Sequence, residues 1–299
     1  MKLSQQLLKA LRELRNGEVP FTYFALRKPF ARKAAQKRMR AAYFAKKWRT
    51  ESSGVACFDF CGAKLPDVSG DTEKLLILAR VFEDTFLIPC YYKDDYRKAL
   101  VERLDKTMGE GPYGYTDGAF DVTVKSGDVV VDAGAWIGDF SAYAASKGAT
   151  VYAFEPTRSS FDWLCRAAAL NGANLHPVQK GLSSREGEAF ISTSDSNSGA
   201  SSIVIKRSAK GEAIALTTLD KFVEENRLPR VDFIKADIEG AERDMLRGAA
   251  QVLKRFAPKL ALCTYHLPDD PAVLEQIIRD ANPRYKVVQL RHKLVAAVV

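Results

Sequence analysis

The sequence lacks the features of membrane-spanning and secreted proteins. No run of about 18 apolar residues occurs, so no segment is predicted to cross a bilayer as a helix. Residues 1–15 alternate charge with leucine and lack the apolar core, at least about seven residues long, that a signal peptide needs. We therefore expect a cytoplasmic protein.

Cysteine is also scarce, with five residues scattered along 299. Only Cys57 and Cys61 lie close together, and no second pair follows to complete a zinc site. An odd, scattered set indicates reduced thiols, and we assign no metal ligands from it. The others are Cys90, Cys165 and Cys263.

Acidic residues are nearly absent from the N-terminal arm. Residues 1–50 contain 14 lysines and arginines against two glutamates, so the net charge of +8 arises there. Such an arm can bind nucleic acid, an anionic membrane surface or an acidic partner. Few aromatic residues are placed for base stacking, so we expect no nucleic acid. Peripheral contact with an anionic surface stays open.

Four glycines and a proline between residues 109 and 118 indicate a boundary. We predict a basic, mainly helical region at 1–110 and a main domain at 111–299. A short strand or a hairpin is predicted within the first region, at 55–65. Its helices are predicted from apolar periodicity at 3–15, 31–49, 72–86 and 94–106.

From Phe120 onward, strand patterns alternate with helix patterns, which predicts a doubly wound, mostly parallel sheet of seven strands. The last two strands are close enough to form a hairpin, so we expect one antiparallel edge strand. An insertion is predicted at 187–216, and its polar segment SDSNSGASS, residues 194–202, is interpreted as a loop, either near the ligand or on the surface. The predicted strands are 129–132, 150–154, 175–180, 231–237, 259–265, 285–290 and 294–299, and the helices are 138–147, 159–170, one from Thr218, 240–256 and 271–281.

The central stretch is DVVVDAGAWIGDFS, residues 128–141. Its valines predict a buried strand that ends in Asp132. Gly134, Ala135 and Gly138 then form a tight turn into a helix. Glycine lets a ligand approach the backbone closely, because it has no Cβ and tolerates positive φ.

Asp132 indicates which ligand the turn binds. A dinucleotide site would have G-x-G-x-x-G, whereas this chain has a carboxylate two residues before Gly134, which would repel a diphosphate. That carboxylate suits a ligand with an ammonium and a sulfonium group, such as S-adenosylmethionine. Glu155, at the tip of the next strand, is placed to accept hydrogen bonds from ribose hydroxyls, which both ligand classes carry.

The strand in VDFIKADIEG contains Lys235 and Asp237 on one side, although it should be buried on both faces. The two could pair with each other, or with Asp132 from the neighbouring strand, at the ligand edge of the sheet. Glu239 and Glu242 open the next helix, where the helix dipole favours carboxylates. A metal or substrate role for Glu239 stays open.

His266 ends the fifth strand, at the same edge as Asp132 and Asp237. It is the titratable group near neutral pH at that edge, with an ordinary pKa near about 6.5. Methylation of an alcohol requires removal of the hydroxyl proton, which a general base assists. A catalytic and a structural histidine are about equally expected at this position.

Together these segments resemble the FkbM family of S-adenosylmethionine-dependent methyltransferases. The resemblance covers about residues 112–299 and implies a Rossmann-like class I methyltransferase fold. It also implies O-methylation of a hydroxyl on a sugar, glycan or secondary metabolite. One departure is Trp136, where the family commonly has asparagine. The matching segments are VVVDAGAWIGDFS, VYAFEP, SGASS, TTLDKFV, VDFIKADIEGAE and TYHLPDD.

We therefore expect an O-methyltransferase that uses S-adenosylmethionine and a small-molecule or glycan acceptor. Two alternatives are an NAD-linked oxidoreductase and a non-catalytic adenosyl-binding or membrane-surface module. Whether a divalent metal assists at Asp237 and Glu239 stays open. The candidates for catalysis are His266, Asp237 and Lys235, and those for cofactor binding are Asp132, Gly134, Ala135, Gly138, Glu155 and Asp237.

Overall fold

The computed structural model describes residues 49–60, 62–71, 113–117, 119–191, 203–204 and 211–299, together with Ala45, Lys74, Leu75 and Leu78. The four predicted N-terminal helices, the polar centre of the insertion and the boundary near residue 110 lie wholly or largely outside these residues. They stay predictions. Among the described helices, none is long and apolar enough to cross a membrane.

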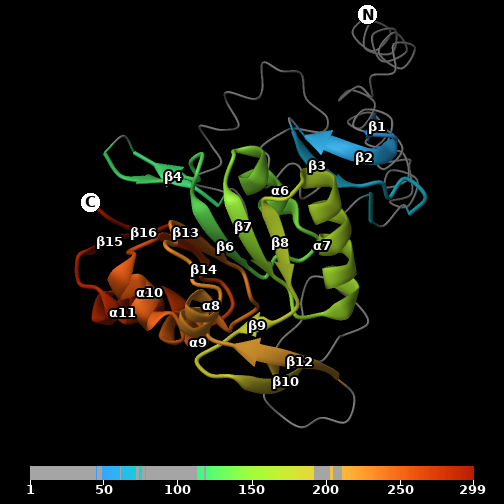
Figure 1. Ribbon diagram of the computed structural model, residues 1–299. Coiled ribbons are helices and arrows are strands. Elements are labelled where there is room, and N and C mark those ends of the chain that lie inside the picture. Colours follow the sequence, from blue (N-terminus) through green and yellow to red (C-terminus); the bar gives the residue numbers. More distant parts are fainter. Residues whose placement is uncertain are drawn as a thin grey trace, which may run out of the picture.

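A seven-stranded sheet forms the centre of the fold (Figure 1). Its central strands are rich in valine, isoleucine and leucine, as expected where both faces of a parallel sheet are covered. The strands are β6 (Val129–Ala133), β7 (Thr150–Phe154), β8 (Leu175–Val178), β13 (Phe233–Ala236), β14 (Lys259–Cys263), β15 (Tyr285–Gln289) and β16 (Lys293–Val298).

The strand order is β15-β16-β14-β13-β6-β7-β8, and the pairs from β14 to β8 are parallel. This confirms the predicted doubly wound, mostly parallel sheet. The expected C-terminal hairpin also forms, but the antiparallel strand is β16, one place in from the edge. The edge strand β15 therefore runs in the same direction as β14, which corrects the prediction of an antiparallel edge.

Helices cover both faces of the sheet (Figure 1). Val131 of β6 packs with the layer of α8, α9, α10 and α11, whereas its neighbour Val130 packs with α6 and α7 on the other face. This alternation follows from the period of two in a strand. The helices are α6 (Asp139–Ser146), α7 (Arg158–Asn171), α8 (Leu219–Glu225), α9 (Glu242–Arg247), α10 (Ala250–Arg255) and α11 (Asp270–Ala281).

The helix predicted at 240–256 is divided into α9 and α10. A Cβ on Gly248 would lie 2.0 Å from the carbonyl oxygen of Ser183, so only glycine fits at the break. The Asp220 carboxylate of α8 then accepts hydrogen bonds from the backbone N–H groups of Gln251 and Val252. These contacts cap a new helix where the apolar pattern alone predicts continuity.

Of the two alternatives predicted at 55–65, a short strand or a hairpin, the structure has the hairpin, and a third strand extends it. Its Phe58 and Leu65 pack on Ala142 and Ala167 of α6 and α7. Asn171 binds both backbone polar groups of Lys64, which fixes the hairpin to the end of α7. The strands are β1 (Arg49–Ser52), β2 (Val55–Phe60) and β3 (Ala63–Pro66).

The ends of the insertion form strands that the sequence analysis does not predict. The polar segment 194–202 lies outside the described residues. Ala189, Ile191 and Ile214 alternate with more exposed residues and make a small core of their own. The small sheet has the order β11-β10-β12-β9, and a separate pair of short strands precedes β6. These strands are β9 (Gly181–Leu182), β10 (Gly187–Ile191), β11 (Ile203–Val204), β12 (Glu212–Thr217), β4 (Tyr115–Thr116) and β5 (Asp121–Val122).

An ion pair lies inside the sheet where β6 and β13 end. Lys235 is paired in register with Asp132, and its Nζ lies 3.0 Å from Asp132 Oδ1. Both side chains are buried, and Ser141 of α6 donates a 2.5 Å hydrogen bond to the other carboxylate oxygen. Burial alone would lower the pKa of Lys235, but the nearby Asp132 and Asp237 carboxylates outweigh burial and raise the pKa above its ordinary value. Lys235 is therefore a buried cation that depends on Asp132.

Replacing Lys235 with methionine should destabilise the fold by about 3–5 kcal/mol, because a buried carboxylate loses its cation. The double variant Lys235→Met with Asp132→Asn should recover part of this loss, since it buries no unpaired charge. Urea unfolding of both variants and the wild type measures the difference. A Lys235→Met free energy of unfolding within about 1 kcal/mol of wild type would show that the pair does not have this role.

Candidate functional site

The turn between β6 and α6 requires glycine at two positions. Gly134 has φ +72°, and a Cβ there would lie 2.0 Å from the carbonyl oxygen of Asp237. Gly138 has φ +87°, and its Cβ would lie 2.9 Å from Leu164 of α7. The predicted glycine turn is therefore held between the tip of β13 and α7, in a conformation that L side chains rarely adopt.

The ion pair of Lys235 and Asp132 lies beside this turn, and Lys235 binds the backbone of the turn. Lys235 Nζ donates to the carbonyl oxygens of Gly134 (2.6 Å) and Ala133 (3.3 Å). The sequence analysis expects Asp132 to contact a cationic ligand and includes Lys235 among the candidates for catalysis. Asp132 is wholly buried, and Lys235 is buried and bound to the turn, so these contacts favour a role for both in holding the turn. We assign both a positioning role instead.

Glu155 connects the turn to the tip of β7. Its Oε2 accepts a 3.1 Å hydrogen bond from the Trp136 backbone N–H, and Oε1 accepts from Thr157 N–H and from the Thr157 hydroxyl. Burial raises the pKa of Glu155 above its ordinary value, although these hydrogen bonds oppose the rise. Each carboxylate oxygen has two lone pairs, so Oε2 still has one to offer a ribose hydroxyl.

Ala135 lies in the same turn and is buried. The backbone N–H groups of Gly134 and Ala135 both donate to the carbonyl oxygen of Phe154, at 3.0 and 2.9 Å. The first part of the turn therefore binds the end of β7.

Asp237 follows β13 and is held by two tyrosines that the sequence analysis missed. Tyr113 donates a 2.7 Å hydrogen bond to Oδ2, and Tyr265 donates a 3.0 Å hydrogen bond to Oδ1. Tyr113 is buried, whereas Tyr265 is 40% exposed. Nothing in the sequence marks Tyr113, because it lies in the glycine-rich segment far from β13. Tyr265 could have been found from its place beside His266.

Four side chains, Asp237, Glu239, Glu242 and His266, form what we call the acidic cluster. His266 Nδ1 lies 3.1 Å from Glu242 Oε1, and Nε2 lies 3.4 Å from Glu239 Oε2 and 3.6 Å from Asp237 Oδ1. These contacts do not have the geometry of hydrogen bonds, so among the described residues neither ring nitrogen has a hydrogen-bond partner. Glu239 reaches the cluster through a left-handed turn, with φ +55°.

The acidic cluster changes the role expected of His266. Burial alone would lower the pKa of His266, but the carboxylates of Glu239, Glu242 and Asp237 outweigh burial and raise the pKa to about 10. The imidazole is then protonated at neutral pH and is not a ready proton acceptor. The expectation of an ordinary pKa is therefore corrected, whereas a general-base role for His266 stays a prediction.

Favourable interaction with the helix dipole does not fully account for Glu242. It is wholly buried, and its Oε1 accepts a 2.9 Å hydrogen bond from the backbone N–H of Ile238. The helix-start position explains an exposed carboxylate but not a buried one.

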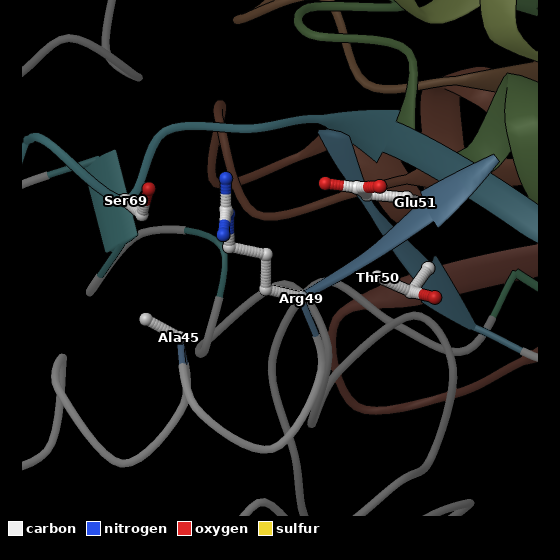
Figure 2. Close-up of a pocket in the computed structure, with 5 residues that line it drawn as sticks. All are labelled: Ala45, Arg49, Thr50, Glu51 and Ser69. Carbon is white, nitrogen blue, oxygen red and sulfur yellow. The ribbon is translucent and has the colours of Figure 1, made fainter. Parts of the chain in front are cut away.

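Two cavities lie away from these residues. One, of about 430 Å³, is lined by Ala45, Arg49, Thr50, Glu51 and Ser69 beside β1 (Figure 2). Arg49 there is already paired with Asp67 at 2.8 Å. The other, of about 440 Å³, lies between Ser183 and Glu188 and extends to Leu216 and Asp244. Neither cavity includes the glycine turn or the acidic cluster.

Trp136 has a φ of +49°, which is unfavourable for a large side chain. Asparagine tolerates this conformation much better, which gives a physical reason why the family commonly has asparagine at this position.

We predict that Trp136→Asn stabilises the fold by about 1 kcal/mol by relieving this strain. Trp136→Ala is the control, because it removes the ring without favouring the left-handed conformation. Thermal unfolding that shows equal changes for the two variants would contradict the prediction.

Comparison with known proteins places the site within a described family. Residues 132–285 match the family model described as the methyltransferase FkbM domain. This range contains the glycine turn, Glu155 and the whole acidic cluster.

Two individual relatives share about 30% of their residues with this chain over about half of its length. The chain is 27% identical to the hexuronic acid methyltransferase AglP of Haloferax volcanii, over 54% of this chain and 66% of that protein. It is 31% identical to the methyltransferase sdnD of Sordaria araneosa, over 45% of this chain and 65% of that protein. The chain thus spans slightly less than two thirds of each relative.

A crystal structure of methyltransferase FkbM from Methylobacillus flagellatus gives a TM-score of 0.47 at 19% identity, covering 80% of this chain and 62% of that one. The family assignment depends on the family model, which matches more than half of the chain. Of the candidate-site residues, only Tyr113 lies outside the matched range. The chain belongs to the FkbM methyltransferase family.

Proposed function

We propose that the protein transfers a methyl group from S-adenosylmethionine to a hydroxyl of a sugar, glycan or secondary metabolite. The observation that carries this proposal is the contact between two parts of the site. The glycine turn packs directly on the Asp237 carbonyl, so a cofactor at the turn lies beside the acidic cluster. Methyl transfer needs that adjacency, because donor and acceptor must be aligned in line.

The glycine turn and Glu155 are proposed to hold the cofactor. Gly134 and Gly138 let the turn pack closely on the Asp237 carbonyl and on α7, which fixes the turn beside Glu155. The second lone pair of Glu155 Oε2 can then accept a hydrogen bond from a ribose hydroxyl. The Asp132–Lys235 pair supports the turn without contacting the ligand. When bound, S-adenosylmethionine supplies an activated methyl group on a sulfonium.

The acidic cluster is proposed to face the acceptor. Asp237 is fixed by Tyr113 and Tyr265, and its side chain is 16% exposed. A carboxylate held in this way can accept a hydrogen bond from the acceptor hydroxyl and orient its oxygen toward the methyl group. The name of the Haloferax relative, a hexuronic acid methyltransferase, supports a sugar as the first acceptor to test.

An NAD-linked oxidoreductase is the alternative from another class. It is disfavoured because the turn has Gly-Ala-x-x-Gly rather than the dinucleotide fingerprint and because the relatives are methyltransferases. A non-catalytic adenosyl-binding module would share the turn. It would not need the carboxylate that Tyr113 and Tyr265 hold at the acceptor side.

Replacing Glu155 with glutamine should weaken binding of S-adenosylhomocysteine at least tenfold. The amide offers a donor where the Trp136 N–H and a ribose hydroxyl both need an acceptor, and each hydrogen bond to a charged group contributes about 1.5–3 kcal/mol. Calorimetry measures the affinity, with exposed Glu224→Gln as the matched control. Unchanged affinity in Glu155→Gln would remove this residue from the cofactor site.

Replacing Asp237 with asparagine should leave affinity for S-adenosylhomocysteine within about threefold of wild type and lower turnover by about 10²–10⁴. The change removes the charge that faces the acceptor but keeps the shape of the side chain. Transfer of a labelled methyl group to a panel of hexuronic acid glycosides measures turnover. If an acceptor is methylated equally well by wild type and variant, Asp237 has no part in the reaction.

A further inference from the structure

The acidic cluster has the arrangement of a cation site. Asp237, Glu242 and His266 each offer one ligand atom, and the three atoms lie within 4.8 Å of one another. One cation can contact all three, because metal–ligand distances are about 2.0–2.6 Å. Glu239 Oε2 lies 3.4 Å from His266 Nε2, so a fourth oxygen borders the same point.

Unpaired polar atoms are concentrated in this cluster. The His266 side chain is 7% exposed, yet neither ring nitrogen has a hydrogen-bond partner in the part of the chain that the structure describes. Glu242 is wholly buried, and its Oε2 also lacks one. Each unsatisfied buried polar group costs about 1–3 kcal/mol. A divalent cation that displaces a proton from His266 would accept electron pairs from the freed ring nitrogen and from the carboxylate oxygens, and would satisfy these atoms together.

The groups around the cluster match those that support metal ligands. Tyr113 and Tyr265 each donate a hydrogen bond to Asp237, and the Ile238 N–H donates to Glu242 Oε1. Ligating carboxylates in proteins are commonly held in this way by outer partners, which fix their orientation. The outer donors leave lone pairs on both carboxylates for an ion.

We propose that Asp237, Glu242 and His266 bind one divalent cation of the Mg²⁺ and Mn²⁺ class. Carboxylate oxygens favour these hard ions, and the single imidazole favours Mn²⁺ of the two. Three carboxylates surround one imidazole, so a dication also offsets an excess of negative charge.

The site lies beside the glycine turn, at the tips of β13 and β14. A cation there would be placed to bind the acceptor hydroxyl and to increase its acidity. That role rests on the proposed methyl transfer, whereas binding of the cation does not.

Electron paramagnetic resonance of Mn²⁺, titrated into the full chain after chelator treatment and without any other ligand, tests the proposal. Wild type should bind one Mn²⁺ per chain, and Mg²⁺ should compete. Glu242→Gln should weaken binding at least tenfold while keeping the hydrogen bond from Ile238. Exposed Glu224→Gln, the same chemical change elsewhere, should bind as wild type does.

Tyr265→Phe provides a second variant that preserves the fold, because the tyrosine is partly exposed and only its hydroxyl is removed. It should weaken Mn²⁺ binding about tenfold, the usual effect of losing an outer partner. Absence of saturable Mn²⁺ binding to wild type would overturn the proposal, as would wild-type affinity in both Glu242→Gln and Tyr265→Phe. Mn²⁺ binding without binding of S-adenosylhomocysteine would uphold the cation site and count against the proposed function.

Discussion

The buried pair of Lys235 and Asp132 is the interaction on which the site depends. It joins β6 to β13 in register, and the same ammonium group binds the carbonyl oxygens of Ala133 and Gly134. The pair therefore sets the position of the glycine turn relative to Asp237. Because a buried ion pair adds little net stability, we attribute its presence to this positioning rather than to the strength of the core.

Around this pair the site has two sides with different chemistry. The turn side is tightly packed backbone, where Gly134 and Gly138 leave no room for side chains. The other side is a cluster of carboxylates about His266, with polar atoms that the described protein groups leave unpaired. The turn side, with Glu155, suits a ligand that carries a ribose, and the other side suits a hydroxyl or a cation. The turn and the acidic cluster meet at Asp237, so ligands bound on the two sides would lie next to each other, which favours transfer of a group between them.

Much of the fold could be predicted from the sequence because its strands and helices have clear periodicity. The glycine turn, the position of Glu155 and the pairing of Lys235 with a neighbouring acid all follow from strand order and buried charge. The break at Gly248 could not be predicted, because it depends on contacts with Ser183 and Asp220. The strands of the insertion could not be predicted either, because they depend on a separate small core. Likewise, no local pattern places Tyr113 beside Asp237, 124 residues away. The pKa of His266 depends on three carboxylates whose distances only the fold sets.

The central claim is that the glycine turn binds the adenosyl group of a methyl donor. Isothermal calorimetry of the wild-type chain with S-adenosylhomocysteine and, separately, with NAD tests it most directly. We predict saturable binding of S-adenosylhomocysteine at one site and no measurable binding of NAD. Binding of NAD without binding of S-adenosylhomocysteine would contradict the claim.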